Sequence, residues 1–135
     1  MATNTGSKGL HIALWVAQGL LAAAFGLAGL MKLTQPTEQL VQAGMSFVNH
    51  YPPGVVRFIG IAEVLAALGL VLPSALRIRP ILTPLAALGL AAVMVLATRY
   101  HITQGEPFVP TVVLFALCTF VAWGRYRMAP IAPRA

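Results

Sequence analysis

Four long apolar runs, separated by short polar segments, dominate the pattern of hydrophobic and polar positions along the chain. Each run approaches or reaches the roughly 20 residues that an α-helix needs to cross the hydrocarbon core of a membrane. The pattern therefore predicts an all-α fold: an integral membrane four-helix bundle, formed by one domain over residues 1–135. The predicted spans cover residues 12–31, 55–72, 81–98 and 108–124.

The longest connection, between the first and second spans, has a helical periodicity of its own. Leu40, Val41, Met45 and Val48 recur at helical spacing within residues 36–48. The segment begins with a proline, which suits a first helical position. We expect a short amphipathic helix that lies on the membrane surface.

Prolines and polar residues mark the expected ends of the spans. Pro73 is expected to stop the second span, because a proline inside a helix removes a backbone hydrogen bond. Arg99 and His101 follow the third apolar run and are expected to end it.

Composition excludes several classes of protein. The chain is 59% hydrophobic and only 9% charged, with a mean hydropathy of +0.83, and a soluble domain of 135 residues could not bury that much apolar surface. Its net charge of +6 does not indicate nucleic-acid binding, because the basic residues lie at the ends of apolar runs. With Cys118 as the single cysteine, a thiol–disulfide relay within the chain is excluded.

The distribution of basic residues predicts the orientation of the spans. Four spans place both termini on one side of the membrane, and that side carries six basic residues against three on the other. Since basic residues are enriched on the cytoplasmic side, we expect a multi-pass protein of the inner (plasma) membrane with both termini in the cytoplasm. The six are Lys8, Arg77, Arg79, Arg125, Arg127 and Arg134, and the three are Lys32, Arg57 and Arg99.

Glu63 stands alone as a carboxylate within the apolar runs. A charged group in hydrocarbon costs at least about 2.5–3.5 kcal/mol on insertion scales, so Glu63 needs either a partner or a neutral form. The small residues Gly60 and Ala67 lie one turn away on its face and would let another helix approach closely. We therefore expect Glu63 to point into the bundle.

The predicted topology gathers Glu63 and four other polar residues in the outer half of the protein or at its outer surface. These five candidate site residues are Lys32, Arg57, Glu63, Arg99 and His101. Two interpretations stay open. Glu63 either forms a structural ion pair, with Lys32 expected before Arg99, or serves as a proton carrier or hydrogen-bond acceptor in a functional site. No spacing of His, Cys, Asp and Glu predicts a metal site.

The order of these residues resembles the DoxX-like membrane proteins, over roughly Trp15 to Arg125. The resemblance implies a four-helix membrane bundle and an association with redox systems, since the namesake of the family is a membrane subunit of a thiosulfate:quinone oxidoreductase. No motif for thiosulfate or sulfur transfer is present, so the enzymatic activity does not carry over. The similar motifs are Phe25-x-x-x-Gly29-x-x-Lys32-Leu33 and Arg57-x-x-Gly60-x-x-Glu63-x-x-x-x-x-Gly69-Leu70-x-x-Pro73.

These observations predict a non-catalytic subunit or anchor of a membrane redox complex. It would hold a protein partner, or a second copy of itself, at the outer face, and would contact lipid or a quinone beside Glu63, Lys32 and Arg99. A small proton-coupled transporter that uses Glu63 and a quinone-linked oxidoreductase are the alternatives. Catalytic and cofactor-binding residues stay unassigned, and no nucleic-acid partner is expected.

Overall fold

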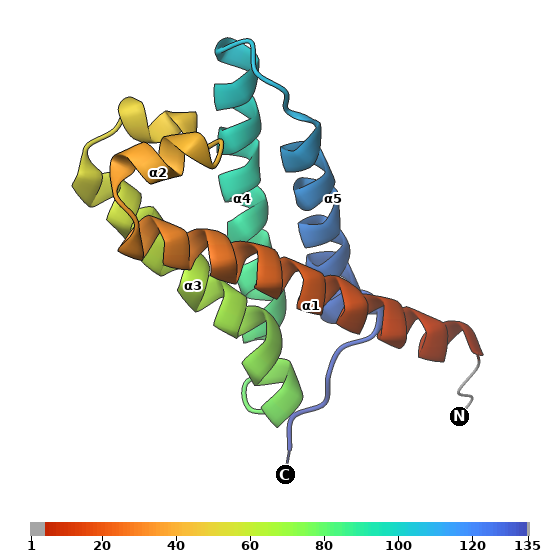
Figure 1. Cartoon of the computed structure of the whole chain (residues 1–135). Helices are drawn as coiled ribbons and strands as arrows, with labels where there is room; N and C mark the ends of the chain where they lie inside the picture. Colours follow the sequence, from red (N-terminus) through yellow and green to blue (C-terminus); the bar gives the residue numbers. More distant parts are fainter. Residues whose placement is uncertain (1–4, 135) are drawn as a thin grey trace.

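In the computed structural model, residues 5–134 are described, and within them the chain forms helices and turns without a strand (Figure 1). Four of the helices are long and apolar enough to cross a membrane, which confirms the predicted four-helix membrane bundle. The long helices are α1 (Thr5–Thr34), α3 (Pro53–Leu76), α4 (Leu82–Thr103) and α5 (Val109–Trp123). The short ones are α2 (Thr37–Gln42), the 3-10 turn η1 (Ser46–Asn49) and the π-helical turn η2 (Gly124–Met128).

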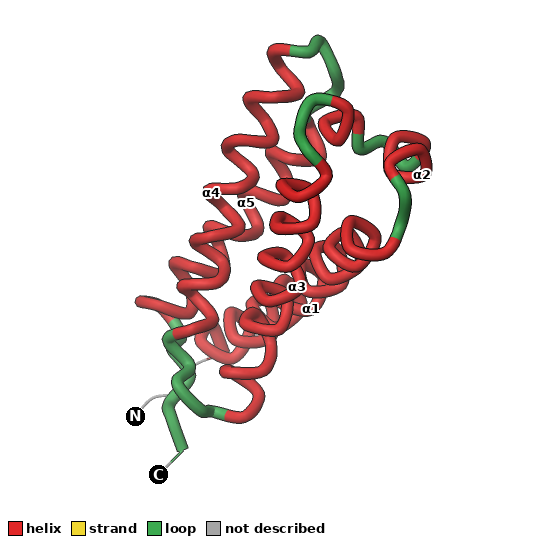
Figure 2. Tube along the Cα trace, turned by 90° about the vertical axis from the view of Figure 1, so that its left-hand side faces the viewer, coloured by secondary structure: helices red, strands yellow, loops and turns green. Residues whose placement is uncertain are grey.

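The long helices pack as two antiparallel pairs, α1 with α3 and α4 with α5 (Figure 2). The pairs meet at the end of the bundle that carries both ends of the chain and diverge toward the end that carries α2 (Figure 1). The main core lies where the pairs meet. There Leu14 and Leu21 of α1 are buried with Leu70 of α3, Leu90 of α4 and Val121 of α5.

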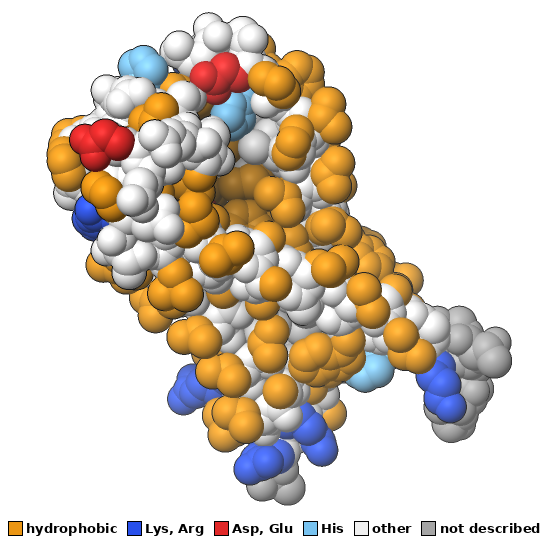
Figure 3. Space-filling model, in the orientation of Figure 1, with side chains coloured by type: hydrophobic (Ala, Val, Ile, Leu, Met, Phe, Trp, Pro, Cys, Tyr) orange, Lys and Arg blue, Asp and Glu red, His pale blue; other side chains and the backbone are white. Residues whose placement is uncertain are grey.

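Apolar side chains also cover the outward faces of the long helices (Figure 3). Phe58, Leu96 and Val109 are 64–69% exposed. Monomeric soluble proteins rarely expose apolar surface on this scale. The bundle is therefore built for a lipid bilayer.

Helices α1 and α3 approach each other most closely at Gly29 and Gly60. A Cβ atom on Gly29 would lie 2.8 Å from the carbonyl oxygen of Gly60, and one on Gly60 would lie 2.9 Å from the carbonyl oxygen of Gly29. Both distances are too short for a real side chain, so the two backbones are in direct contact. Gly60 thus admits another helix beside Glu63, as its small size led us to expect.

The expectation that Pro73 stops the second span is wrong, because α3 continues to Leu76. A proline at this position leaves the carbonyl of Gly69 without its helical donor. The hydroxyl of Thr83, on α4, donates to that carbonyl at 3.0 Å and replaces the lost bond. The helix ends instead where Arg77 takes a left-handed conformation, with φ of 57°.

The third span also runs further than predicted. Helix α4 reaches Thr103, so Arg99 and His101 lie on its last turns rather than after its end. The fourth span ends as predicted near Gly124, but one π-helical turn, η2, extends it to Met128.

The segment between the first two spans forms two short pieces instead of one amphipathic helix. Gly44, with φ of 96°, separates α2 from η1. The predicted apolar face is nevertheless present, because Leu40 and Val48 are buried against Val56 of α3. We call α2, η1 and the residues between them the outer segment.

The glycine contact predicts a selective sensitivity to added methyl groups. Gly29→Ala and Gly60→Ala should each lower the melting temperature of the purified protein, since overpacking costs about 1–3 kcal/mol. Gly19→Ala is the matched control, because nothing lies within 4 Å of a Cβ at Gly19. That variant should melt at or above the wild-type temperature, and equal melting of all three variants would contradict the contact.

Candidate functional site

Lys32 and Glu63 form a buried ion pair between α1 and α3. The Nζ atom of Lys32 donates to Oε1 of Glu63 at 2.6 Å, and each side chain is only 6% exposed. The close approach at Gly60 makes this pairing feasible, because a Cβ on Gly60 would lie 3.0 Å from the Cβ of Lys32. The cation beside Glu63 is thus Lys32, the first of the two partners that we expected from the sequence.

Two further residues enclose the pair. The ring of Phe47, on η1, lies 5.7 Å from Nζ of Lys32 and covers it from the outer segment. Arg57, on α3, donates through Nη1 to the backbone carbonyls of Lys32 and Gln35. Since the last carbonyls of a helix lack intrahelical donors, Arg57 caps the C-terminal end of α1.

The ion pair joins opposite charges in an apolar setting, so neither remains isolated there. Removing one partner of such a pair is costly, whereas the intact pair is electrically neutral. This arrangement suits a contact that fixes the register of two helices. A carboxylate already bound to an ammonium group is less suited to shuttling protons.

His101 belongs to a second polar group, at the end of the bundle that carries η1. Its Nδ1 lies 2.8 Å from Oε1 of Glu106, and the hydroxyl of Ser46 donates to Oε2 of Glu106 at 2.7 Å. Tyr100 and His50 meet nearby, with 2.8 Å between Oη and Nδ1. These contacts connect η1 to α4 and to the α4–α5 loop, and so close the gap between the two helix pairs.

The hydrogen bond from Ser46 and, after it, the bond to His101 hold the pKa of Glu106 below its ordinary value. Both bonds favour the ionised carboxylate. The outer contact is therefore strongest when Glu106 is charged.

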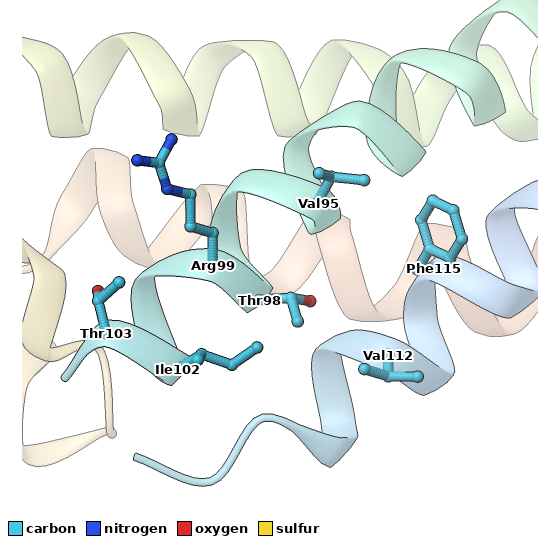
Figure 4. A pocket seen from close by; sticks show the side chains of 7 residues that line it. All are labelled: Val95, Thr98, Arg99, Ile102, Thr103, Val112 and Phe115. Carbon is cyan, nitrogen blue, oxygen red and sulfur yellow. The ribbon is translucent and has the colours of Figure 1, made fainter. Parts of the chain in front are cut away.

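Arg99 stands apart from both groups. Its side chain is exposed, and within residues 5–134 it makes no hydrogen bond or ion pair. It borders a groove of about 360 Å³ between α4 and α5 (Figure 4). The structure thus divides the predicted cluster among three places: Lys32, Arg57 and Glu63 lie together, His101 binds Glu106, and Arg99 lies at the edge of the groove.

A third polar group, near the chain ends, was not predicted. Arg125, on η2, is only 3% exposed, and its Nε donates to Oε1 of Gln18 at 2.7 Å. Its Nη1 lies 3.0 Å from Nδ1 of His11, and its guanidinium lies 5.5 Å from the ring of Trp15. Gln18 in turn donates to the carbonyl of Leu70 at 2.6 Å. This group connects α1 to α3 and to the end of the last span.

Sequence reasoning assigned Arg125 to the membrane interface, where basic residues commonly end a span. The informative signal was Gln18, a strongly polar side chain within the first span. A buried amide needs a partner, and Arg125 lies at the same end of the bundle. Among the described residues, no three side chains of His, Cys, Asp or Glu lie together in a way that could hold a metal ion.

Comparison with known families confirms the resemblance found in the sequence. The model of the DoxX-like family matches residues 16–124. The chain belongs to the DoxX-like family. The region of this DoxX-like protein that matches includes Lys32, Glu63 and both glycines of the α1–α3 contact, whereas Arg125 lies just beyond it. No curated protein and no solved structure gives a significant match.

The ion pair predicts strong coupling between two substitutions. Glu63→Gln and Lys32→Met should each destabilise the protein by about 3–5 kcal/mol, because each leaves one buried charge without its partner. The double variant should recover much of that loss. Unfolding of the four purified proteins by denaturant or heat measures the coupling.

Arg99→Met provides the control for this cycle. It removes a cation that makes no contact with Glu63 in the described structure. Combined with Glu63→Gln, it should show no coupling. A Glu63→Gln protein with wild-type stability would rule out the structural ion pair.

The lowered pKa of Glu106 predicts a pH-dependent contribution to stability. Because the pKa is lower in the folded state, the contribution is fully present above the ordinary glutamate value of 4.5 and is lost as pH falls through the folded value. The melting temperatures of wild type and Glu106→Gln should therefore differ near neutral pH and converge below about pH 4.5. Glu38→Gln, at an exposed position of α2, is the control and should follow the wild type throughout.

Proposed function

We propose that this DoxX-like protein is a non-catalytic subunit or anchor of a membrane redox complex, and that it holds a protein partner at the end of the bundle that carries the outer segment. The observation that carries the proposal is the Lys32–Glu63 pair. In this pair Glu63, the carboxylate of the described membrane spans, is bound by Lys32 of another helix. The redox association is inferred from the likeness to the family's namesake.

The outer end has features that suit a docking platform. The second polar group binds η1 to α4 and to the α4–α5 loop, so the surface is assembled from both helix pairs. Glu38 is exposed there, and Tyr51 is 47% exposed beside η1. An exposed acidic group and an exposed aromatic ring at this end of the bundle favour a partner with a basic and partly apolar surface.

The two alternatives have less support. A proton-coupled transporter needs a carboxylate free to gain and lose a proton, whereas Glu63 is bound by Lys32. Of the three residues expected beside a quinone, Lys32 and Glu63 bind each other. The guanidinium N–H groups of Arg99 bind no other group within the described part of the chain. Of the three residues, Arg99 is therefore the one that could donate to a quinone.

Charge supports a location in the inner membrane with both termini in the cytoplasm. Most Lys and Arg side chains in Figure 3 gather at the end that carries the chain ends, and the acidic side chains lie at the opposite end. Positive residues favour the cytoplasmic side.

A reporter fused after Arg134 should therefore read cytoplasmic, and one inserted near Gln42 should read external. The reverse pattern would place the outer segment in the cytoplasm and contradict the proposed orientation.

Site-directed photo-crosslinking in native membranes tests the anchor itself. A crosslinker at Glu38 or Tyr51 should capture one discrete protein that carries a redox cofactor, and a crosslinker at Arg127 should not. Purified protein alone should neither reduce quinone nor transport a solute in response to a proton gradient. Proton-coupled transport that Glu63→Gln abolishes in a folded protein would replace this proposal with the transporter, and quinone turnover by the purified chain would replace it with the oxidoreductase.

A further inference from the structure

The groove between α4 and α5 has almost wholly apolar walls, with Arg99 at its edge. Its volume is about 360 Å³, within the range of pockets that hold small molecules. The hydroxyl of Thr98 lies 2.7 Å from the carbonyl oxygen of Met94 and 2.8 Å from the hydroxyl of Thr111, so it is already bonded within the protein. The groove is lined by Val95, Thr98, Arg99, Ile102, Thr103, Val112 and Phe115 (Figure 4).

Arg99 supplies the positive charge of this groove. In Figure 4 its side chain stands at the edge of the groove, with the guanidinium directed away from α5. It lies four residues before the end of α4, hence about 6 Å from that end at the helical rise. This depth suits the head-group layer of a bilayer if α4 spans the membrane.

No acidic residue of the outer half compensates Arg99 within the described structure. Glu63 is bound by Lys32, and Glu106 is bound by Ser46 and His101. Arg57, the other arginine of this half, already donates to the end of α1. Arg99 therefore presents an unneutralised cation at the membrane surface, directly beside an apolar groove.

We infer that the α4–α5 groove binds an anionic phospholipid, with the lipid phosphate on Arg99 and an acyl chain against Val95 and Phe115. A guanidinium binds phosphate through charge-assisted hydrogen bonds, which are stronger than its bonds to a neutral carbonyl. From Thr103 to Val95 the groove follows eight residues of α4, about 12 Å at the helical rise, so an acyl chain can enter it lengthwise. This inference does not depend on the proposed redox role.

Lipid binding to the purified full-length protein tests the inference. Delipidated protein in a neutral detergent is titrated with dioleoyl phosphatidylglycerol or with dioleoyl phosphatidylcholine, and bound lipid is counted by native mass spectrometry. The two lipids share acyl chains and a phosphate, but only the first is anionic. Wild type should bind phosphatidylglycerol about tenfold more tightly, as expected for one charge-assisted contact.

Two substitutions test separately the contribution of the Arg99 charge and that of the apolar groove. Arg99→Gln should abolish the tenfold preference while leaving weak binding of both lipids. Val112→Trp, which fills the groove but keeps the charge, should weaken the binding of both lipids.

Arg127→Gln, the control, removes an exposed arginine at the opposite end of the bundle and should leave binding unchanged. A thermal melt of each variant verifies that it is folded, and Arg99→Lys, which keeps the charge, should retain most of the preference.

Several results would overturn the inference. Equal affinity of wild type for the two lipids would remove the role of charge. An undiminished preference in folded Arg99→Gln would place the anion elsewhere, and undiminished binding in folded Val112→Trp would exclude the groove. Displacement of phosphatidylglycerol by an equimolar short-chain quinone would assign the groove to a quinone instead.

Discussion

The direct backbone contact between Gly29 and Gly60 is the constraint on which the outer half of the protein depends. In a bilayer, burial of apolar surface between helices contributes little, because lipid tails are as apolar as the side chains they replace. Close packing and polar contacts must hold the helices together instead. With no side chain between them, α1 and α3 come near enough for Lys32 to reach Glu63 across the interface. A larger residue at either glycine would separate the ion pair as well as the backbones.

Polar side chains connect the two helix pairs both in the half that holds the main core and in the half where the pairs diverge. The main core occupies the half of the bundle near the chain ends, and there Arg125, Gln18 and His11 connect α1 to the last span. In the other half the helix pairs diverge, and the bonds of Glu106 and Ser46 connect them at the surface. The burial of Arg125 among neutral partners, with Trp15 beside its guanidinium, shows that a cation can be held without a carboxylate when hydrogen bonds satisfy its donors.

Sequence alone predicts the spans because length and hydropathy are local properties of the chain. It also predicts that Glu63 needs a partner or a neutral form, since the cost of an isolated carboxylate in hydrocarbon does not depend on the fold. The end of α3 could not be predicted, because Pro73 is accommodated by Thr83, a residue of another helix. The separation of Arg99 from Glu63 and the burial of Arg125 likewise depend on how the helix pairs diverge, which no local pattern encodes.

The outer segment covers the ion pair, and this has a consequence for access to Glu63. Phe47 lies over Lys32, while Ser46, the residue before it, is bonded to Glu106 in the α4–α5 loop of the other helix pair. Glu63 becomes accessible through this cover only when the outer segment moves away from Lys32, and that movement breaks the bond of Ser46 to Glu106. Along that route, opening of the ion pair is therefore coupled to a contact between the outer segment and the other helix pair.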